Sequence, residues 1–457
     1  MKILFVAHQF FPEHYAGVEI ITLGLAKEFR RRGHESFVLA PKRSRPVNEI
    51  DPGETEDYEF EGVPVRRIGR PTEGFGRPYR LDFENETMER RAREYVREVS
   101  PDIIHAEHFQ GLSASVVPVL KEAGVPLVYT ATDFWTMCPV VDFRRHDGTM
   151  CTGPDLPNCM KCIMSRYPMS RSKSVVMRTP ETALRLLGKA ASTSLGSISH
   201  QTQQMKDLGE RAGYIREQME GVDHIVAYTH LMEELLSKNG IGEGKTEVSH
   251  YGIDTSLIER REPDEERDGP FRIGFIGTLA PHKGCDILIE AVKRMPDADV
   301  MLDIYGNLDR FQSFIRKMKK IAGDDARIEF RGPFQRERVG EVLASLDTLV
   351  VPSRWYENQP GVILEGFASG MPVVVTDLGG MSEFVHHEKN GLLFALDDPD
   401  DLARQLTRLA EEPGLAQRLR AGIGPVKTVS DDADELETLY ARLRENRAGS
   451  HTEGEAR

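Results

Sequence analysis

The sequence predicts an α/β protein with two doubly wound domains. A strand–helix–strand pattern occurs twice, once from residue 2 and again from residue 271, and this duplication carries the prediction. The chain has 457 residues, enough for roughly two to four domains with separate cores. Its 39% hydrophobic and 29% charged residues are typical of a folded protein and exclude a disordered or membrane-spanning chain.

The first pattern opens with a short apolar strand over residues 2–7. Apolar residues then recur at the spacing of one helical face from Val18 to Phe29, and three arginines followed by Gly33 mark the end of the helix. A second strand over residues 36–40 completes a unit that almost always has parallel strands. The pattern continues with a helix near residues 83–99 and strands near residues 102–105 and 126–130.

The second pattern opens with the strand FRIGFIG at Phe271. Further strands are predicted near residues 300–305, 327–331, 348–351 and 372–376, with helices between them. A charged stretch without periodicity near residues 258–268 predicts a linker. We therefore expect an N-terminal domain over residues 1–258, a C-terminal domain over 269–425, a terminal helix over 426–445 and a disordered tail over 446–457.

Charge and cysteine content narrow the classes of function. Acidic residues outnumber basic residues 73 to 59, which gives a net charge of -14, so we expect no nucleic-acid partner. The first residues lack the apolar stretch and cleavage site of a secretory signal, and 5 cysteines do not make a disulfide framework in a chain of this length. Both observations predict a cytoplasmic protein.

The loop after the first strand of the second domain predicts an anion site. Residues 277–284, GTLAPHKG, join a strand to a helix, so backbone N–H groups and Lys283 lie beside the positive end of that helix. The alternative is an ordinary turn with an exposed lysine. Neither first strand is followed by GxGxxG, which disfavours a dinucleotide-dependent oxidoreductase.

Two glutamates form a second candidate site. Pro360 and Gly361 interrupt any helix, so Glu357 is predicted in a loop and Glu365 near the start of a helix that begins close to Gly361. A helix N-terminus attracts a diphosphate, and a nearby carboxylate can accept hydrogen bonds from vicinal hydroxyls. In the alternative interpretation, Glu365 is only a residue that the helix dipole favours.

Taken together, these motifs resemble the family-four retaining glycosyltransferases of the GT-B fold, from MKILFVAHQFFPEHYAGVE through SHYGID to PVVVTDLGG. The resemblance implies two Rossmann-like domains that face a central cleft. It also implies transfer of a hexose from a nucleotide diphosphate sugar to a glycan or lipid-linked acceptor, as in surface polysaccharide biosynthesis, with no cofactor required for catalysis.

The resemblance further implies roles for single residues. Donor binding falls to Gly17, Thr278, Lys283, Gly361, Val362 and Glu365, and catalysis to Glu357, Asp133 and His108. Lys283 and the Gly361 and Val362 amides would hold the diphosphate. Glu365 would bind the ribose, and Glu357 would bind the donor sugar. Relatives often carry arginine at Thr278, and many carry histidine where this chain has Thr132. His105 and His108 follow the preceding strand and are candidates for this space, with His108 taken as the candidate catalytic residue. A histidine with only a structural role is the alternative.

Four of the five cysteines gather in one insert, residues 138–162. Cys138, Cys151, Cys159 and Cys162 follow the spacing C-x12-C-x7-C-x2-C in a segment without helical or strand periodicity. Four thiolates can bind zinc tetrahedrally, and such a site would fold a loop that lacks its own core. The insert is therefore predicted to hold a structural zinc ion. Free thiols or a disulfide are the alternative.

A cationic segment follows the cysteines. Between residues 161 and 189 the chain has seven lysines and arginines and a single acid, Glu181. This composition predicts a surface that contacts anionic headgroups or the acceptor at the inner membrane surface. A solvated helix face is the alternative.

Two further functions stay open at this level. One is a nucleotide-sugar 2-epimerase on the same double fold, which would need its own acid and base in the cleft. The other is a non-catalytic, zinc-stabilised interaction protein. Turnover of a nucleotide sugar would separate this second alternative from both enzymes.

Overall fold

The computed structural model describes residues 1–14, 16–42, 52–70, 79–166, 171–193, 199–262 and 269–455, without the side chains of residues 171, 172, 193, 201 and 448–455. The chain divides into two compact units. The N-terminal unit comprises Met1–His250 and Val429–Arg457, and the C-terminal unit comprises Tyr251–Thr428. The predicted linker begins eight residues after this boundary, and its residues 263–268 lie outside the described part.

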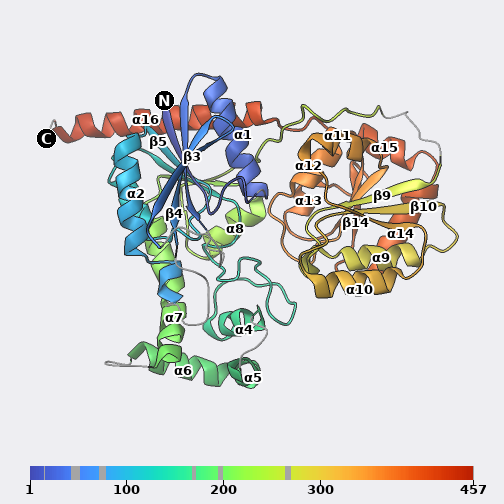
Figure 1. Ribbon diagram of the computed structural model, residues 1–457, viewed down its shortest axis with the longest axis horizontal. Helices are drawn as coiled ribbons and strands as arrows, with labels where there is room; N and C mark the ends of the chain where they lie inside the picture. The colour runs from blue at the N-terminus through green and yellow to red at the C-terminus, as the bar shows by residue number, and fades with distance from the viewer. Residues whose placement is uncertain are drawn as a thin grey trace. The chain divides into compact units, whose positions relative to one another are not determined.

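An eight-stranded sheet forms the centre of the N-terminal unit (Figure 1). Its strand order is β3-β4-β2-β1-β5-β6-β7-β8, and only the β3–β4 pair is antiparallel among the described strands. The strands are β1 (Lys2–Val6), β2 (Glu35–Lys42), β3 (Thr55–Phe60), β4 (Val63–Gly69), β5 (Ile103–Ala106), β6 (Leu127–Ala131), β7 (His224–Ala227) and β8 (Thr246–Val248).

Helices of the N-terminal unit cover this sheet and form the insert between β6 and β7. They are α1 (Gly17–Arg31), α2 (Glu86–Val99), α3 (Val116–Lys121), α4 (Leu156–Arg166), α5 (Arg171–Arg178), α6 (Glu181–Thr193), α7 (His200–Met219), α8 (His230–Lys238) and α16 (Val429–Glu455), with the short 3-10 helix η1 (Tyr79–Asp82). Helix α2 begins three residues later than predicted because the side chain of Asn85 accepts the N–H groups of Thr87 and Met88 and caps the helix.

The C-terminal unit repeats the architecture with a six-stranded parallel sheet of order β11-β10-β9-β12-β13-β14. The strands are β9 (Phe271–Ile276), β10 (Val300–Tyr305), β11 (Ile328–Gly332), β12 (Thr348–Val351), β13 (Val373–Thr376) and β14 (Gly391–Phe394). The helices are α9 (Cys285–Lys293), α10 (Gln312–Ala322), α11 (Val339–Ala344), α12 (Gly361–Ala368), α13 (Met381–Phe384), α14 (Pro399–Glu411) and α15 (Leu415–Ala421), with η2 (Pro281–Lys283) and η3 (Arg336–Arg338).

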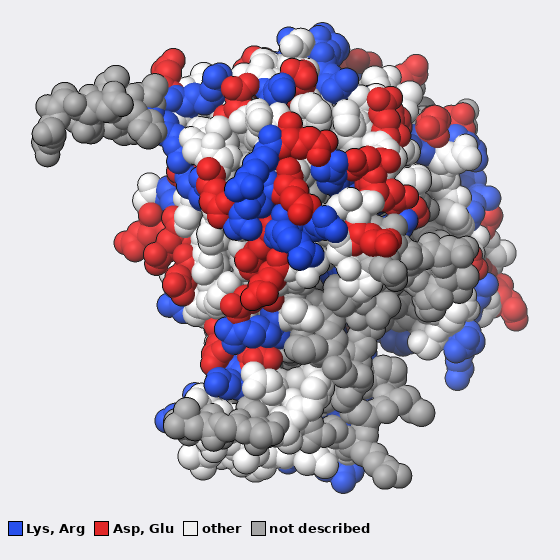
Figure 2. All heavy atoms as spheres, turned by 60° about the vertical axis from the view of Figure 1, so that its left-hand side comes forward, with Lys and Arg blue, Asp and Glu red and all other residues white. Residues whose placement is uncertain are grey.

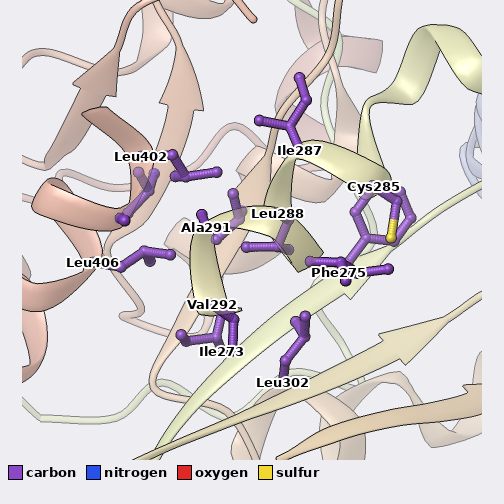
Figure 3. Close-up of a cluster of buried hydrophobic side chains, with 14 of the residues drawn as sticks. Ile273, Phe275, Cys285, Ile287, Leu288, Ala291, Val292, Leu302, Leu402 and Leu406 are labelled. Atoms are coloured by element: carbon purple, nitrogen blue, oxygen red, sulfur yellow. The ribbon is translucent and has the colours of Figure 1, made fainter. Parts of the chain in front are cut away.

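A continuous apolar cluster joins the helices of the C-terminal unit to its sheet. Figure 3 shows Ile273 and Phe275 of β9 turned toward side chains of α9, with α14 packed against the same helix. Cys285 lies inside this cluster with no exposed surface. Burial raises the pKa of its thiol well above the ordinary value. Cys285 is therefore a packing residue.

The strand orders place two loop clusters at the points where each sheet changes direction. Strand β1 is flanked by β2 and β5, and β9 is flanked by β10 and β12, so the chain winds outward in both directions from β1 and from β9. Ligands of doubly wound sheets bind at the carboxyl ends of the strands beside such a point. The predicted site residues of each unit lie in the loops and helix starts that follow these strands.

The C-terminal end of the chain differs from the prediction. Helix α16 continues to Glu455, so most of the segment expected as a disordered tail, residues 446–457, is helical. Arg447 stabilises the extension because its guanidinium donates to the Val125 carbonyl and lies 3.5 Å from an Asp223 carboxylate oxygen. Figure 1 shows α16 lying along the N-terminal unit, to which contact with α1 also assigns it.

Candidate active site

Gly284 allows the loops after β9 and β12 to meet. It has a φ of 69°, and a Cβ atom there would collide with the carbonyl oxygen of Pro352. Only glycine fits this position without displacing one of the two loops. The approach brings Lys283, the last residue of η2, to the segment after β12 that carries Glu357. Thr278, in the same loop, is exposed.

Lys283 and Glu357 form an ion pair, with 2.7 Å between Nζ and Oε1. The same oxygen accepts hydrogen bonds from Ser353 Oγ at 2.6 Å and from the Trp355 indole N–H at 2.7 Å. The Lys283 side chain is 27% exposed and the Glu357 side chain 8% exposed, so the lysine is the more accessible partner. The sequence predicted Lys283 and Glu357 but neither Ser353 nor Trp355.

Opposing effects set the ionisation of Glu357. Burial raises its pKa, but the charge of Lys283 and the hydrogen bonds from Lys283, Ser353 and Trp355 outweigh burial and bring the pKa below the ordinary value. Glu357 is therefore an ionised carboxylate at neutral pH. The lysine also lies 5.0 Å from the Trp355 ring centroid, within the range of a cation–π contact.

Helix α12 begins at Gly361, as predicted, and presents its first N–H groups beside this cluster. Gly361 and Val362 are its first two residues, so their N–H groups have no acceptor within the helix. A Cβ atom at Gly361 would lie 2.9 Å from the Tyr251 hydroxyl, which donates to the carbonyl of Gln359 at 3.0 Å. The predicted SHYGID segment thus buttresses the start of α12.

Glu365, one turn further along α12, forms an ion pair with Arg336 of η3. Arg336 follows β11, so a third strand of the sheet contributes to the same region. The Glu365 side chain is 14% exposed and that of Arg336 39%. The sequence did not predict Arg336. A basic residue close after a buried parallel strand was the available signal.

His108 and Asp133 are hydrogen-bonded in the N-terminal unit, with 2.7 Å between Nε2 and Oδ2. The amide of Gln110 donates to His108 Nδ1 at 2.9 Å, so a neutral ring carries its proton on Nε2 and donates it to Asp133. Thr132, in the place of the expected histidine, donates to the Glu107 carbonyl at 3.0 Å. His108 is fully buried, so this geometry makes it a group that orients Asp133.

Two further ionisable side chains adjoin this pair. The His8 ring lies 4.6 Å from the His108 ring between centroids, and His8 Nε2 lies 3.6 Å from Glu19 Oε1. Glu19 accepts the N–H of Ala16 at 2.7 Å and is buried, and burial raises its pKa. Gly17, the first residue of α1, is exposed, with open space around the position of a Cβ atom. The sequence did not predict His8 or Glu19, although a glutamate three residues after a helix cap is a common N-terminal signature.

The four cysteines of the insert all have free thiols. Cys138, Cys159 and Cys162 are buried, whereas Cys151 is half-buried. Burial raises the pKa of Cys138 to about 11. The N–H groups of Phe143 and Val140 hydrogen-bond its sulfur and partly oppose this increase. Burial raises the pKa of Cys159 to about 12, with a further contribution from the other three cysteines. In the described residues, no three His, Cys, Asp or Glu side chains converge to hold a metal ion. Zinc binding therefore stays a prediction.

Comparison with known proteins was made by sequence and by structure. Residues 16–155 match the family model described as glycosyl transferase 4-like domain, and residues 270–412 match the model described as glycosyl transferases group 1. These matches cover α1 and the loops after β5 and β6 in one unit, and the loops after β9, β11 and β12 in the other.

Curated relatives agree with these matches. A D-inositol 3-phosphate glycosyltransferase of Thermomonospora curvata is 27% identical over 313 residues, which cover 62% of this chain and 66% of the relative. An uncharacterized glycosyltransferase of Methanocaldococcus jannaschii is 32% identical over 201 residues, which cover 43% of this chain and 52% of that protein. The chain thus matches about half to two thirds of the length of these relatives.

Solved structures share the fold across nearly the whole chain. Sucrose-phosphate synthase of Thermosynechococcus elongatus has a TM-score of 0.64 and 17% identity, with 97% of this chain and 98% of that one covered. HepE of Anabaena in complex with UDP and glucose has a TM-score of 0.60 and 18% identity, with 96% and 99% covered. Two family models in the expected order and two parallel-rich α/β units therefore lead to one conclusion: the chain belongs to the family-four glycosyltransferases of the GT-B fold.

Proposed function

We propose that this protein is a retaining glycosyltransferase that transfers a hexose from a nucleotide diphosphate sugar to a glycan or lipid-linked acceptor. The observation that carries the proposal is the cluster of Lys283, Glu357 and the first turn of α12 in the unit that matches the glycosyltransferase group 1 model. HepE, a structural neighbour, is described in complex with UDP and glucose and with UDP-glucose, which supports a nucleotide-sugar donor.

The cluster contains the groups that a departing diphosphate needs. As the bond between the anomeric carbon and the diphosphate oxygen lengthens, negative charge grows on the diphosphate and positive charge on the sugar ring. The ammonium of Lys283 and the N–H groups of Gly361 and Val362 would stabilise the first charge, and the carboxylate of Glu357 the second. We propose that these groups suffice, without a divalent ion, to stabilise the leaving group.

The acceptor is proposed from the relatives. Several relatives are D-inositol 3-phosphate glycosyltransferases, which supports an acceptor that carries phosphate. An acceptor linked to lipid through a diphosphate shares this anionic chemistry, and we propose that synthesis of a surface polysaccharide takes place on the cytoplasmic side of the membrane.

Three substitutions test the donor site. Lys283→Ala removes a contact that strengthens as the diphosphate leaves, so transfer should fall by about 100-fold or more while donor affinity falls less. Glu357→Gln should lower kcat, because the carboxylate faces the reacting sugar. Glu365→Gln should raise the donor KM, because it weakens a contact to ribose that is equal in ground and transition states.

Turnover should be measured with a panel of nucleotide sugars, by release of the nucleoside diphosphate with and without acceptor and by the configuration of the product. Lys320→Ala, at an exposed lysine of α10, is the matched control and should behave as wild type. Wild-type turnover in all three site variants, each with a wild-type Tm, would contradict the assignment. A product with an altered sugar and no acceptor would instead identify a 2-epimerase.

A further inference from the structure

The insert between β6 and β7 carries two short helices away from the sheet. Figure 1 shows α5 and α6 at the end of α7 that is remote from the strands of the N-terminal unit. Contacts between α4, α6 and α7 fix this arrangement within the unit. Helices α5 and α6 therefore form a projecting tip that is separate from the candidate active site residues of the same unit.

One face of α6 explains how the tip is attached. Leu184 and Ala191 are each 2% exposed, and Gly188 lies between them on the same face of the helix. A Cβ atom at Gly188 would collide with the Leu156 side chain of α4. Leu184, Gly188 and Ala191 thus make the inner face of α6, and the close approach of α4 depends on the glycine.

Large apolar side chains occupy the outer face of the tip. Leu186 is 68% exposed, Leu187 54% and Val175 of α5 67%, and these three are the most exposed large hydrophobic side chains in the described residues. The helical repeat places Leu186 and Leu187 on the side of α6 that also carries Ala183 and Ala190. A soluble helix normally presents polar residues on its outer face, so this second apolar face indicates a contact surface.

Cationic side chains flank these apolar residues. Arg185 and Lys189, one turn apart on α6, lie beside Leu186, and Lys173 and Arg178 lie on α5 with Val175. Arg185 is also 2.9 Å from an Asp155 oxygen, yet its side chain remains 58% exposed. Glu181 is the single acid of residues 171–193. On a protein with a net charge of -14, the tip is locally positive.

The distribution of charge over the rest of the unit is different. Figure 2 shows lysine and arginine mixed with aspartate and glutamate over the body of the face that it presents, while white and blue spheres predominate among the coloured atoms at its lower end, the level of α5 and α6 in Figure 1. Exposed leucines flanked by lysines and arginines match a bilayer that offers both acyl chains and anionic headgroups.

We propose that the tip formed by α5 and α6 docks the protein on an anionic lipid bilayer. Val175, Leu186 and Leu187 enter the boundary between headgroups and acyl chains, and Arg178, Arg185 and Lys189 contact the headgroups. This docking does not depend on the donor site and is tested apart from it.

The test is co-sedimentation of the full chain with vesicles of phosphatidylcholine and with vesicles in which about a third of the lipid is phosphatidylglycerol. Wild type should bind the anionic vesicles at low salt and bind them more weakly as salt rises, because salt screens the headgroup contacts. The double variant Leu186→Ser with Leu187→Ser should weaken binding about tenfold or more, because it removes two leucines that would be buried in the bilayer. Arg178→Glu with Lys189→Glu should abolish the preference for anionic vesicles.

Matched controls come from the C-terminal unit and from α8. Phe311→Ser and Leu396→Ser remove exposed apolar side chains elsewhere, and Lys238→Glu reverses an exposed charge, so all three should bind vesicles as wild type does. Equal binding by wild type and both tip variants would overturn the proposal. A wild-type dimer in solution that the leucine variant converts to a monomer, without vesicle binding by either, would assign the face to a second copy of the chain instead.

Discussion

Lys283 shows how a predicted residue can have an unexpected partner. In the structure its ammonium is bound to Glu357, so in the function we propose a donor diphosphate would compete with this carboxylate for the lysine. The two residues are 74 apart in sequence, and only the close approach at Gly284 brings them together. Residue type and spacing predicted both side chains, but their pairing and the supporting roles of Ser353 and Trp355 depend on packing that periodicity does not encode.

A buried carboxylate outside the donor site provides a test of stability. Burial raises the pKa of Glu107 to about 8, and the charge of Asp432 on α16 contributes to the increase. The unfolded chain releases this proton near the ordinary value of 4.5, so the folded state holds one proton more between pH 4.5 and about 8. Stability contributed by Glu107 is therefore fully present below pH 4.5 and decreases as pH rises to about 8.

Glu107→Gln should remove this pH dependence. The slope of the unfolding free energy against pH is proportional to the difference in bound protons between the folded and the unfolded chain. Between pH 5 and 8, this difference should be smaller in the variant than in wild type by up to about one proton. The measurement is urea unfolding at several pH values, with Glu122→Gln, at an exposed glutamate of the same unit, as control. Parallel curves for wild type and Glu107→Gln would show that Glu107 is already ionised in the folded protein.

At the scale of elements, the sequence predicted β1, β2, β5 and β6 of the N-terminal sheet and β9 to β13 of the C-terminal sheet to within two or three residues. Strands β10 and β12 match their predicted ranges, because runs of mostly apolar residues between turn residues leave little choice. Strands β3, β4, β7, β8 and β14 were not predicted. Alternating charged and apolar residues, as in the TEDYEF of β3, belong to an antiparallel edge pair that the strand–helix–strand pattern does not include.

The cysteine insert is the element for which we predict a bound metal ion. We predict about one zinc ion per chain bound by Cys138, Cys151, Cys159 and Cys162, because this insert supplies four unbridged thiols that can form a tetrahedral site once a metal draws them together. Elemental analysis of the purified protein should find zinc, and Cys151→Ser and Cys162→Ser should lower it. Cys285→Ala, in the other unit, should retain the metal. Stoichiometric iron, or four freely titratable thiols with no metal, would contradict the prediction.

At the scale of the whole molecule, α16 makes the N-terminal unit discontinuous in sequence. Ala433 and Tyr440 of α16 are fully buried in the core of that unit, and the Tyr440 hydroxyl is hydrogen-bonded to His105 of β5. The amphipathic pattern predicted the helix, but a pattern identifies only an apolar face and not the surface that covers it. The sequence pattern therefore could not predict which unit α16 completes.

Truncation at Thr428 should destabilise the N-terminal unit and spare the C-terminal unit, because only the former loses core residues. Differential scanning calorimetry should show one transition at lower temperature and one unchanged. Truncation after Arg447, which keeps Tyr440 and the contacts of Arg447, is the control and should leave both transitions in place. Equal loss in both transitions would mean that the two units unfold together.

The placement of α16 also sets an order for folding during synthesis. A ribosome releases the strands of the N-terminal unit first, but the helix that completes their core emerges only after the whole C-terminal unit. The C-terminal unit, Tyr251–Thr428, is continuous and can close its own core before that moment. The surface that later receives Tyr440 stays open throughout the synthesis of the C-terminal unit, so the nascent N-terminal unit is the part of this protein that most needs a chaperone.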